Sequence, residues 1–362
     1  PNDNHYAGKE LRLKQQYFFI SASLQALIEK YKKKHGDIRK LHEKVVIQMN
    51  DTHPTVAVPE LMRLLIDVEG LSWEDAWEVT SKTCAYTNHT IMAEALEKWP
   101  IDLFSKLLPR IYQIVQEIDR RFLIKVREMY PGNEEKVRKM AILMNGQVRM
   151  ANMAIVAGFS VNGVAQLHTE ILEKQELKDF YQMMPEKFNN KTNGITFRRW
   201  LEFSNQPLAA YIKELIGDEY LHDATKLEKL LAFKDDKKVH QQLAKIKFEN
   251  KLALKAYLKE NKGIELDENS IIDTQIKRFH EYKRQQMNAL YVIHKYLEIK
   301  AGKLPKRKIT VIFGGKAAPA YIIAQDIIHL ILCLSELINN DPKVNKYLNV
   351  HLVENYNVSV AE

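Results

Sequence analysis

The stretch SIIDTQIKRFHEYKRQ, residues 270–285, joins an apolar run of strand length to a cluster of cations. Two more apolar runs of strand length follow, KITVIF at 308–313 and NVHLV at 349–353. Long helical patterns, 280–299 and 317–338, follow the first two runs. Strands that alternate with helices predict an α/β fold with a parallel, doubly wound sheet. Ligands bind such sheets beyond the carboxyl ends of the strands, which is where the cations lie.

The cation cluster consists of Lys277, Arg278, Lys283 and Arg284, and the sequence GGK at 314–316 follows the next strand. Both groups belong to the same predicted sheet edge, where helix N-termini would add N–H donors for anions. A solvated helix start is the alternative interpretation of the cluster. The position of the cluster at the predicted ligand edge of the sheet favours a phosphate site over this alternative.

The charge of the chain is uneven. Residues 191–362 carry 28 Lys and Arg against 21 Asp and Glu, whereas residues 1–190 carry 26 against 25. The excess indicates anionic ligands in the second half. Small phosphates are favoured over nucleic acid, because no nucleic-acid-binding motif occurs and aromatic residues are not interleaved with the cations.

Two cysteines, Cys84 and Cys333, lie far apart in the sequence and in no metal-ligand spacing. Their number argues for a reducing compartment and against a structural zinc site. The longest apolar run is interrupted by polar residues, and no signal peptide is recognisable. We therefore expect a cytoplasmic protein without metal, membrane or nucleic-acid partners.

The first half is predicted to be mostly helical. Helical patterns occur at 11–34, 104–123 and 150–172, and KVVIQMN at 44–50 is predicted to be a buried strand. Ser72, followed by an acidic residue three positions later, is a candidate N-cap.

The change of pattern after residue 190 predicts two domains, residues 1–190 and residues 191–362. The chain starts at Pro1 without methionine and stops at Glu362 directly after an apolar alternation. We expect it to be an internal fragment of a longer protein.

Three polar segments are further site candidates. QMNDTHP at 48–54 ends the predicted strand, although it is equally well explained as a simple turn. AYTNHT at 85–90 is predicted to lie inside a helical segment, where a lone histidine is more often structural. NKTNGITFRRWL at 190–201 supplies the turn between the halves and opens the next helix.

Together these segments resemble the α-glucan (glycogen, starch and maltodextrin) phosphorylase family. NDTHP, AYTNHT, KTNGIT-RRWL, KRFHEYKRQ, GGKAAP and ENYNVSVAE occur in the order of that family, and the resemblance extends over all 362 residues. It implies two Rossmann-like domains of the GT-B type, each only partly represented here. It also implies an enzyme that uses pyridoxal 5′-phosphate and transfers terminal α-1,4-linked glucose of a glucan onto inorganic phosphate.

The resemblance assigns roles to individual positions. Arg278 and Lys283 match cations at the substrate phosphate, while His89, Asn193 and Tyr282 match residues that bond the glucose hydroxyls. The residues matched to the cofactor site are Lys277, Trp200, Lys316 and Tyr356. The residues matched to substrate contacts are Val164, Asp51, His53 and the gating-loop residues Asn2, Asp3 and Asn4.

Some features depart from the family pattern. Phe197 stands where proline is usual, and Ala320 stands where glycine is usual. The lysine that holds the cofactor as an imine belongs to a segment after VSVAE, so the resemblance places it outside this chain and implies that the chain alone is inactive. It also implies a homodimer for the full-length enzyme. A nucleotide-sugar glycosyltransferase of the same architecture remains the alternative.

Overall fold

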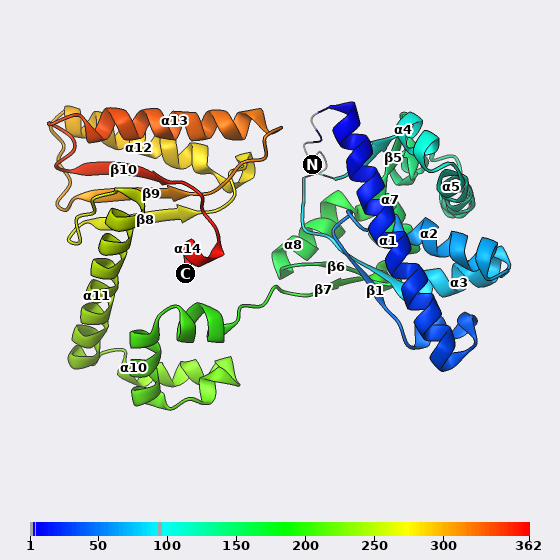
Figure 1. Ribbon diagram of the computed structural model, residues 1–362, viewed down its shortest axis with the longest axis horizontal. Coiled ribbons are helices and arrows are strands. Elements are labelled where there is room, and N and C mark those ends of the chain that lie inside the picture. The colour runs from blue at the N-terminus through cyan, green and yellow to red at the C-terminus, as the bar shows by residue number, and fades with distance from the viewer. Residues whose placement is uncertain (1–2, 4, 93–95) are drawn as a thin grey trace. The chain divides into compact units, whose positions relative to one another are not determined.

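The computed structural model describes residue 3, residues 5–92 and residues 96–362. The chain divides into two compact units, Pro1–Gly194 and Ile195–Glu362. Each unit has hydrophobic clusters of its own. The two units are described separately below (Figure 1).

Unit 1 is built from helices around a small parallel sheet. Its helices are α1 (Tyr6–His35), α2 (Ala57–Arg63), α3 (Trp73–Thr83), α4 (Ile101–Leu107), α5 (Pro109–Met129), α6 (Glu134–Met140), α7 (Met150–Ala157), α8 (Gln166–Ile171) and α9 (Lys178–Met183). Its strands are β1 (Ile47–Asn50), β2 (Cys84–Thr87), β3 (Lys98–Pro100), β4 (Leu143–Met144), β5 (Gln147–Arg149), β6 (Val161–Gly163) and β7 (Phe188–Asn190). Strands β1-β2-β6-β7 form the parallel sheet in that order, and β3-β5-β4 form an antiparallel one.

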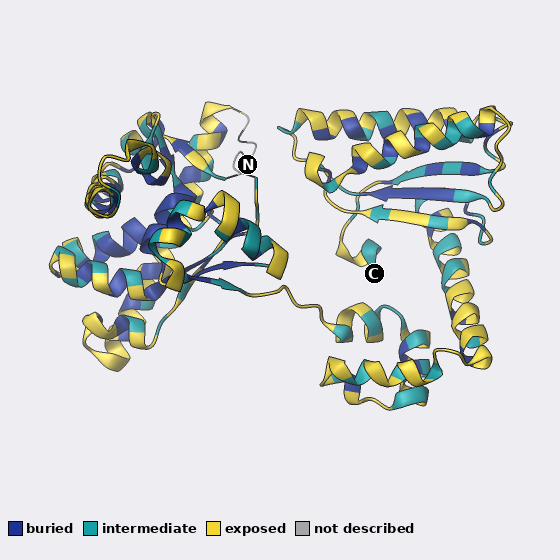
Figure 2. Ribbon diagram, turned by 180° about the vertical axis from the view of Figure 1, so that it is seen from behind, coloured by how far each residue is buried: buried dark blue, intermediate teal, exposed yellow. Residues whose placement is uncertain are grey.

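Unit 2 contains a three-stranded parallel sheet in the order β10-β9-β8. Its strands are β8 (Ile271–Ile276), β9 (Ile309–Gly314) and β10 (Leu348–Val353). Its helices are α10 (Gln206–Ile216), α11 (Lys237–Lys262), α12 (Gln285–Lys300), α13 (Ile322–Asn339) and α14 (Val358–Ala361). The central strand β9 is almost wholly buried, whereas the edge strand β8 is largely exposed (Figure 2).

Helices α12 and α13 pack side by side on one face of this sheet (Figure 1). Among the described helices, α13 is long and apolar enough by length and composition to cross a membrane. Here it packs on β10 instead, and Ser335 Oγ donates to the carbonyl of Val350 at 2.6 Å. Its buried residues recur at helical spacing: Ala324, Ile327, Ile331, Leu334 and Ile338.

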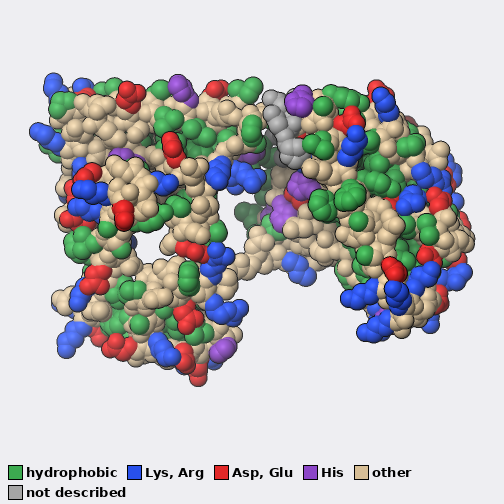
Figure 3. Space-filling view, viewed as in Figure 1, with side chains coloured by type: hydrophobic (Ala, Val, Ile, Leu, Met, Phe, Trp, Pro, Cys, Tyr) green, Lys and Arg blue, Asp and Glu red, His purple; other side chains and the backbone are tan. Residues whose placement is uncertain are grey.

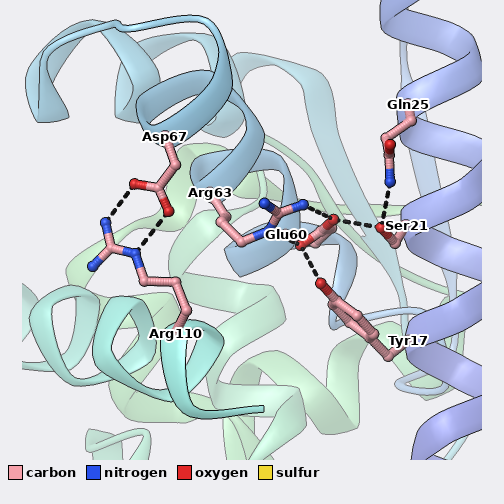
Figure 4. Close-up of polar contacts among 7 residues, drawn as sticks. All are labelled: Tyr17, Ser21, Gln25, Glu60, Arg63, Asp67 and Arg110. Carbon is pink, nitrogen blue, oxygen red and sulfur yellow. Dashed lines mark hydrogen bonds and ion pairs between the residues drawn. The ribbon is translucent and has the colours of Figure 1, made fainter.

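A buried carboxylate ties α1 to α2. Glu60 is fully buried and accepts two bonds from Arg63, at 2.7 and 2.8 Å (Figure 4). Ser21 and Tyr17 of α1 donate to the same carboxylate at 2.6 and 3.1 Å. Four donor contacts therefore compensate the burial of this charge.

The structure confirms a mixed α/β fold with parallel sheets, and all three strands predicted in the second half are present. Ser72 accepts from the N–H of Asp75 at 3.1 Å, as its predicted N-cap role requires. The helix predicted at 280–299 begins later than expected, because α12 starts at Gln285 with Arg284 as its N-cap.

Two helical predictions for unit 1 are wrong. Residues 84–87 form β2, so Asn88 and His89 follow a strand and do not lie inside a helix. The pattern at 150–172 is interrupted by β6. Both strands are short and buried, and an apolar run of that length has the composition of a buried helix as well.

Candidate active site

In unit 1, the predicted site residues gather at the carboxyl ends of the parallel strands. Asp51 follows β1, His89 follows β2, Val164 follows β6 and Asn193 follows β7. The backbone N–H of Asp51 donates to the carbonyl of Thr87 at 3.0 Å. The N–H of Asn193 donates to the carbonyl of Val164, also at 3.0 Å. Backbone pairing therefore continues past the strand ends and positions these residues.

Asp51 has the left-handed φ of 66°, and its carboxylate accepts from the N–H of Thr52 at 2.6 Å. This bond goes to the residue directly after Asp51 and fixes the carboxylate against the turn that follows β1. The ring of His89 is exposed, and its Nε2 contacts the side-chain oxygen of Asn50. That contact joins the segments that follow β1 and β2.

A cavity of about 330 Å³ lies at the β1 side of this edge. Asp51, His53 and Asp3 line it, so the structure brings these three predicted residues together. Asn2 and Asn4, of the same predicted gating loop, lie outside the described residues.

Sequence reasoning missed part of this cavity. Arg12 of α1 reaches the carboxylate of Glu97 at 3.1 Å, and both residues line the cavity. Within the described part of the chain, Glu97 Oε1 and Trp99 Nε1 are buried without a hydrogen-bond partner. Arg12 and Glu97 are 85 positions apart, so no local pattern could have connected them.

His168 of α8 was also missed. Its Nδ1 accepts from the backbone N–H of Val164 at 3.1 Å. The pKa of His168 is lowered, because burial lowers it more than a hydrogen bond with the backbone of Thr90 raises it, and the nearby His89 also lowers it. The neutral ring can therefore serve as an acceptor that holds the segment after β6.

In unit 2, the cation cluster lies at the carboxyl end of β8. The N–H of Lys277 donates to the carbonyl of Gly314 at 2.9 Å, and the N–H of Phe279 donates to that of Lys316 at 3.0 Å. The cluster and the GGK segment are thus directly paired, as the sequence predicts. A Cβ on Gly315 would lie 2.2 Å from the carbonyl oxygen of Lys277, so this close pairing requires glycine.

A buried glutamine supports the cluster from α12. Gln285 is 1% exposed, and its Nε2 donates to the carbonyls of Arg278 and Lys277 at 3.0 and 3.3 Å. The side chains of Lys277 and Arg278 themselves are exposed. The backbone is thus fixed while the charged groups remain available to a ligand.

Of the remaining cations, Lys283 ends the short 3-10 helix η9 (Glu281–Lys283) and Arg284 follows it. The ring centroids of His280 and Tyr282 are 4.4 Å apart. Burial lowers the pKa of the His280 imidazole. Lys283 Nζ lies 5.6 Å from the centroid of the Tyr282 ring. Tyr282 is 57% exposed, so its hydroxyl is accessible.

The other predicted cofactor residues lie on neighbouring segments of unit 2. A Cβ on Gly314 would lie 3.4 Å from the ring of Tyr356, which follows β10. Trp200 belongs to η6 (Arg198–Phe203), and its neighbour Arg199 forms an ion pair with Glu362. That pair ties η6 to the segment after β10.

On the face seen in Figure 3, basic and acidic side chains are interspersed over much of the surface. In the sequence, four lysines and arginines are grouped within residues 277–284. The chemistry of these side chains suits a phosphate group, because a guanidinium binds two phosphate oxygens at once and ammonium groups add point charges.

Comparison with known proteins identifies the family of the chain. The family model described as "Carbohydrate phosphorylase" matches residues 1–362. The chain is 53% identical over 361 residues to "Maltodextrin phosphorylase" of Streptococcus pneumoniae, covering 100% of this chain and 47% of that protein. It is 50% identical over 376 residues to "Glycogen phosphorylase, muscle form" of Ovis aries, covering 100% of this chain and 44% of that protein.

The chain spans about half the length of the curated relatives it matches. The match nevertheless includes every segment that carries a candidate site residue. The chain belongs to the carbohydrate phosphorylase family.

Proposed function

We propose that the protein carrying this chain cleaves terminal α-1,4-linked glucose from an α-glucan with inorganic phosphate and releases glucose 1-phosphate. The observation that carries this proposal is the paired cation cluster of unit 2, Lys277 and Arg278 beside Lys316. It occurs in a chain similar to proteins named maltodextrin and glycogen phosphorylase. A phosphate that attacks or leaves needs such cations to offset its charge.

Arg278 and Lys283 are proposed to bind the substrate phosphate. His89, Asn193 and Tyr282 are proposed to hold the glucose hydroxyls, since all three are exposed at the carboxyl edge of their sheet. Contacts to the sugar and to the neighbouring glucosyl unit are assigned to Val164, Asp51, His53 and Asn4.

The donor set at the β8–β9 edge also fits the phosphate ester of pyridoxal 5′-phosphate. Lys277 and Lys316 would hold that ester, and Trp200 and Tyr356 would pack around the ring. When bound, the cofactor supplies a phosphate group able to exchange a proton with the substrate phosphate. Within this chain, Arg278 would orient the substrate phosphate and the lysines would reduce the repulsion between the two phosphates. The lysine that carries the cofactor is proposed to lie outside this chain.

At the level of architecture we infer a GT-B enzyme. Unit 1 would belong to its glucan-binding domain and unit 2 to its cofactor-binding domain, with predicted boundaries at residues 190 and 191. We further propose a cytoplasmic homodimer that binds neither nucleic acid nor membrane.

The test is an assay of the whole protein with maltoheptaose and inorganic phosphate. Glucose 1-phosphate should accumulate, and it should stay absent when phosphate is omitted. Glucosyl transfer from a nucleotide sugar, with no phosphate-dependent release, would instead support the glycosyltransferase alternative.

A further inference from the structure

A cavity of about 850 Å³ lies away from the candidate active site. It is lined by Gly158 and Phe159, which precede β6, and by Lys187, which precedes β7. It therefore lies at the amino ends of the strands of unit 1, at the opposite edge from His89 and Asn193. Its volume is in the range of small-molecule sites, roughly 300–1,000 Å³.

The walls of the cavity are rich in aromatic rings. Trp73 and Trp77 come from α3, Phe122 comes from α5, and Phe159 lies before β6. Such walls suit a flat apolar ligand, because aromatic faces bury large area with defined geometry.

Lys187 supplies the polar group of the cavity. Its Nζ donates to the carbonyls of Ile155 and Val156 at 3.1 and 2.9 Å, in the last turn of α7. A neutral amine has two N–H groups and one lone pair, so these two carbonyls satisfy both donors of the neutral form. The lone pair then remains available for a bond to a ligand carbon.

Burial lowers the pKa of Lys187 to about 8, the adjacent Glu186 raises it, and Lys125 lowers it. At pH 7.5 about a quarter of this amine is neutral, against about 0.1% for an ordinary lysine of pKa 10.4. The fraction of nucleophile is therefore about two hundredfold higher than at a surface lysine.

The charges around the cavity discriminate between ligands. The carboxylates that line it are Glu74, Glu78, Glu128 and Glu186, and the cations besides Lys187 are Arg121 and Lys125. Arg121 is already paired with Glu117 and Glu74, at 2.5 and 2.8 Å. Glu78 is likewise paired, with Lys82 at 2.6 Å, which leaves Glu128 and Glu186 against Lys125 and Lys187 and no charge excess to attract an ionic ligand.

We propose that this cavity is a second small-molecule site, which takes an uncharged aromatic aldehyde and holds it as an imine on Lys187. The amine attacks the carbonyl carbon and forms the C–N bond. The carbonyl oxygen then gains protons and leaves as water, while the nitrogen loses its hydrogens. No redox partner is needed for this condensation, and the ring lies among Trp73, Trp77 and Phe159.

The test is to treat the chain with benzaldehyde and cyanoborohydride, digest it and map the labelled lysines by mass spectrometry. At pH 7.5 Lys187 should be labelled at least tenfold faster than Lys125, which lines the same cavity. The rate at Lys187 should rise with pH through pH 8 and level off above about pH 9, because a group with a pKa of about 8 is half neutral at pH 8 and about nine-tenths neutral at pH 9.

Two comparisons sharpen the result. Lys187→Arg keeps donors for the carbonyls of α7 and should abolish the fast label, with the labelling of Lys125 unchanged. The anionic 4-formylbenzoate should react more slowly at Lys187 than benzaldehyde does. The proposal is overturned if Lys187 and Lys125 react at equal rates, if labelling rises only towards pH 10, or if 4-formylbenzoate reacts faster.

Discussion

At the scale of single residues, two carboxylate–arginine pairs of unit 1 differ in how far they are buried. Glu60 has no exposed surface, yet a guanidinium and two hydroxyl groups satisfy its carboxylate. The bidentate pair of Asp67 and Arg110, at 2.6 and 2.7 Å, has similar geometry but remains partly exposed (Figure 4). The two pairs differ in desolvation, so they should differ in their effect on stability.

Glu60→Ala should lower the free energy of unfolding by about 3–5 kcal/mol, because it leaves Arg63 and two hydroxyl groups without their acceptor. Asp67→Ala, the matched control, should cost no more than about 1 kcal/mol, since water can solvate Arg110. Urea unfolding of both variants measures the difference. Equal losses would show that the buried network has no special role.

At the scale of elements, the sequence predicts strands well where they alternate with long helices. β8, β9 and β10 have six residues each and are separated by helices of 16 and 18 residues. β6 and β7 have three residues each, and tertiary pairing rather than local pattern makes them strands. The candidate site follows the same division: the cluster at 277–284 could be predicted, whereas the contact between Arg12 and Glu97 depends on packing.

The pairing of strand ends is also an element-scale feature that can be tested. Gly315→Ala should lower the free energy of unfolding by about 1–3 kcal/mol, because its Cβ would clash with backbone and with the ring of Phe279. Gly194→Ala is the matched control, since a Cβ there meets no atom within 4 Å. The denaturant midpoints of the two variants measure the difference in their stability. A Gly315 variant as stable as the control would mean that the segments that follow β8 and β9 can move apart without cost.

At the scale of the whole molecule, each unit has its own parallel sheet and its own proposed ligand edge. The edge of unit 1 carries hydrogen-bonding side chains suited to a sugar, and the edge of unit 2 carries cations suited to phosphate. This division of chemistry is what the proposed phosphorolysis requires. It rests on the assignment of Arg278 to the substrate phosphate.

Steady-state kinetics of Arg278→Ala in the whole enzyme, with phosphate and glucan varied separately, test this assignment most directly. The variant should lose roughly thirtyfold or more in kcat/KM for phosphate, equivalent to about 2 kcal/mol, with a much smaller change in KM for glucan. Arg307→Ala is the matched control, because Arg307 precedes β9 at the opposite edge of the same sheet and donates to the carbonyl of Asn269. Unchanged phosphate dependence in the Arg278 variant, or an equal loss in the Arg307 variant, would contradict the account.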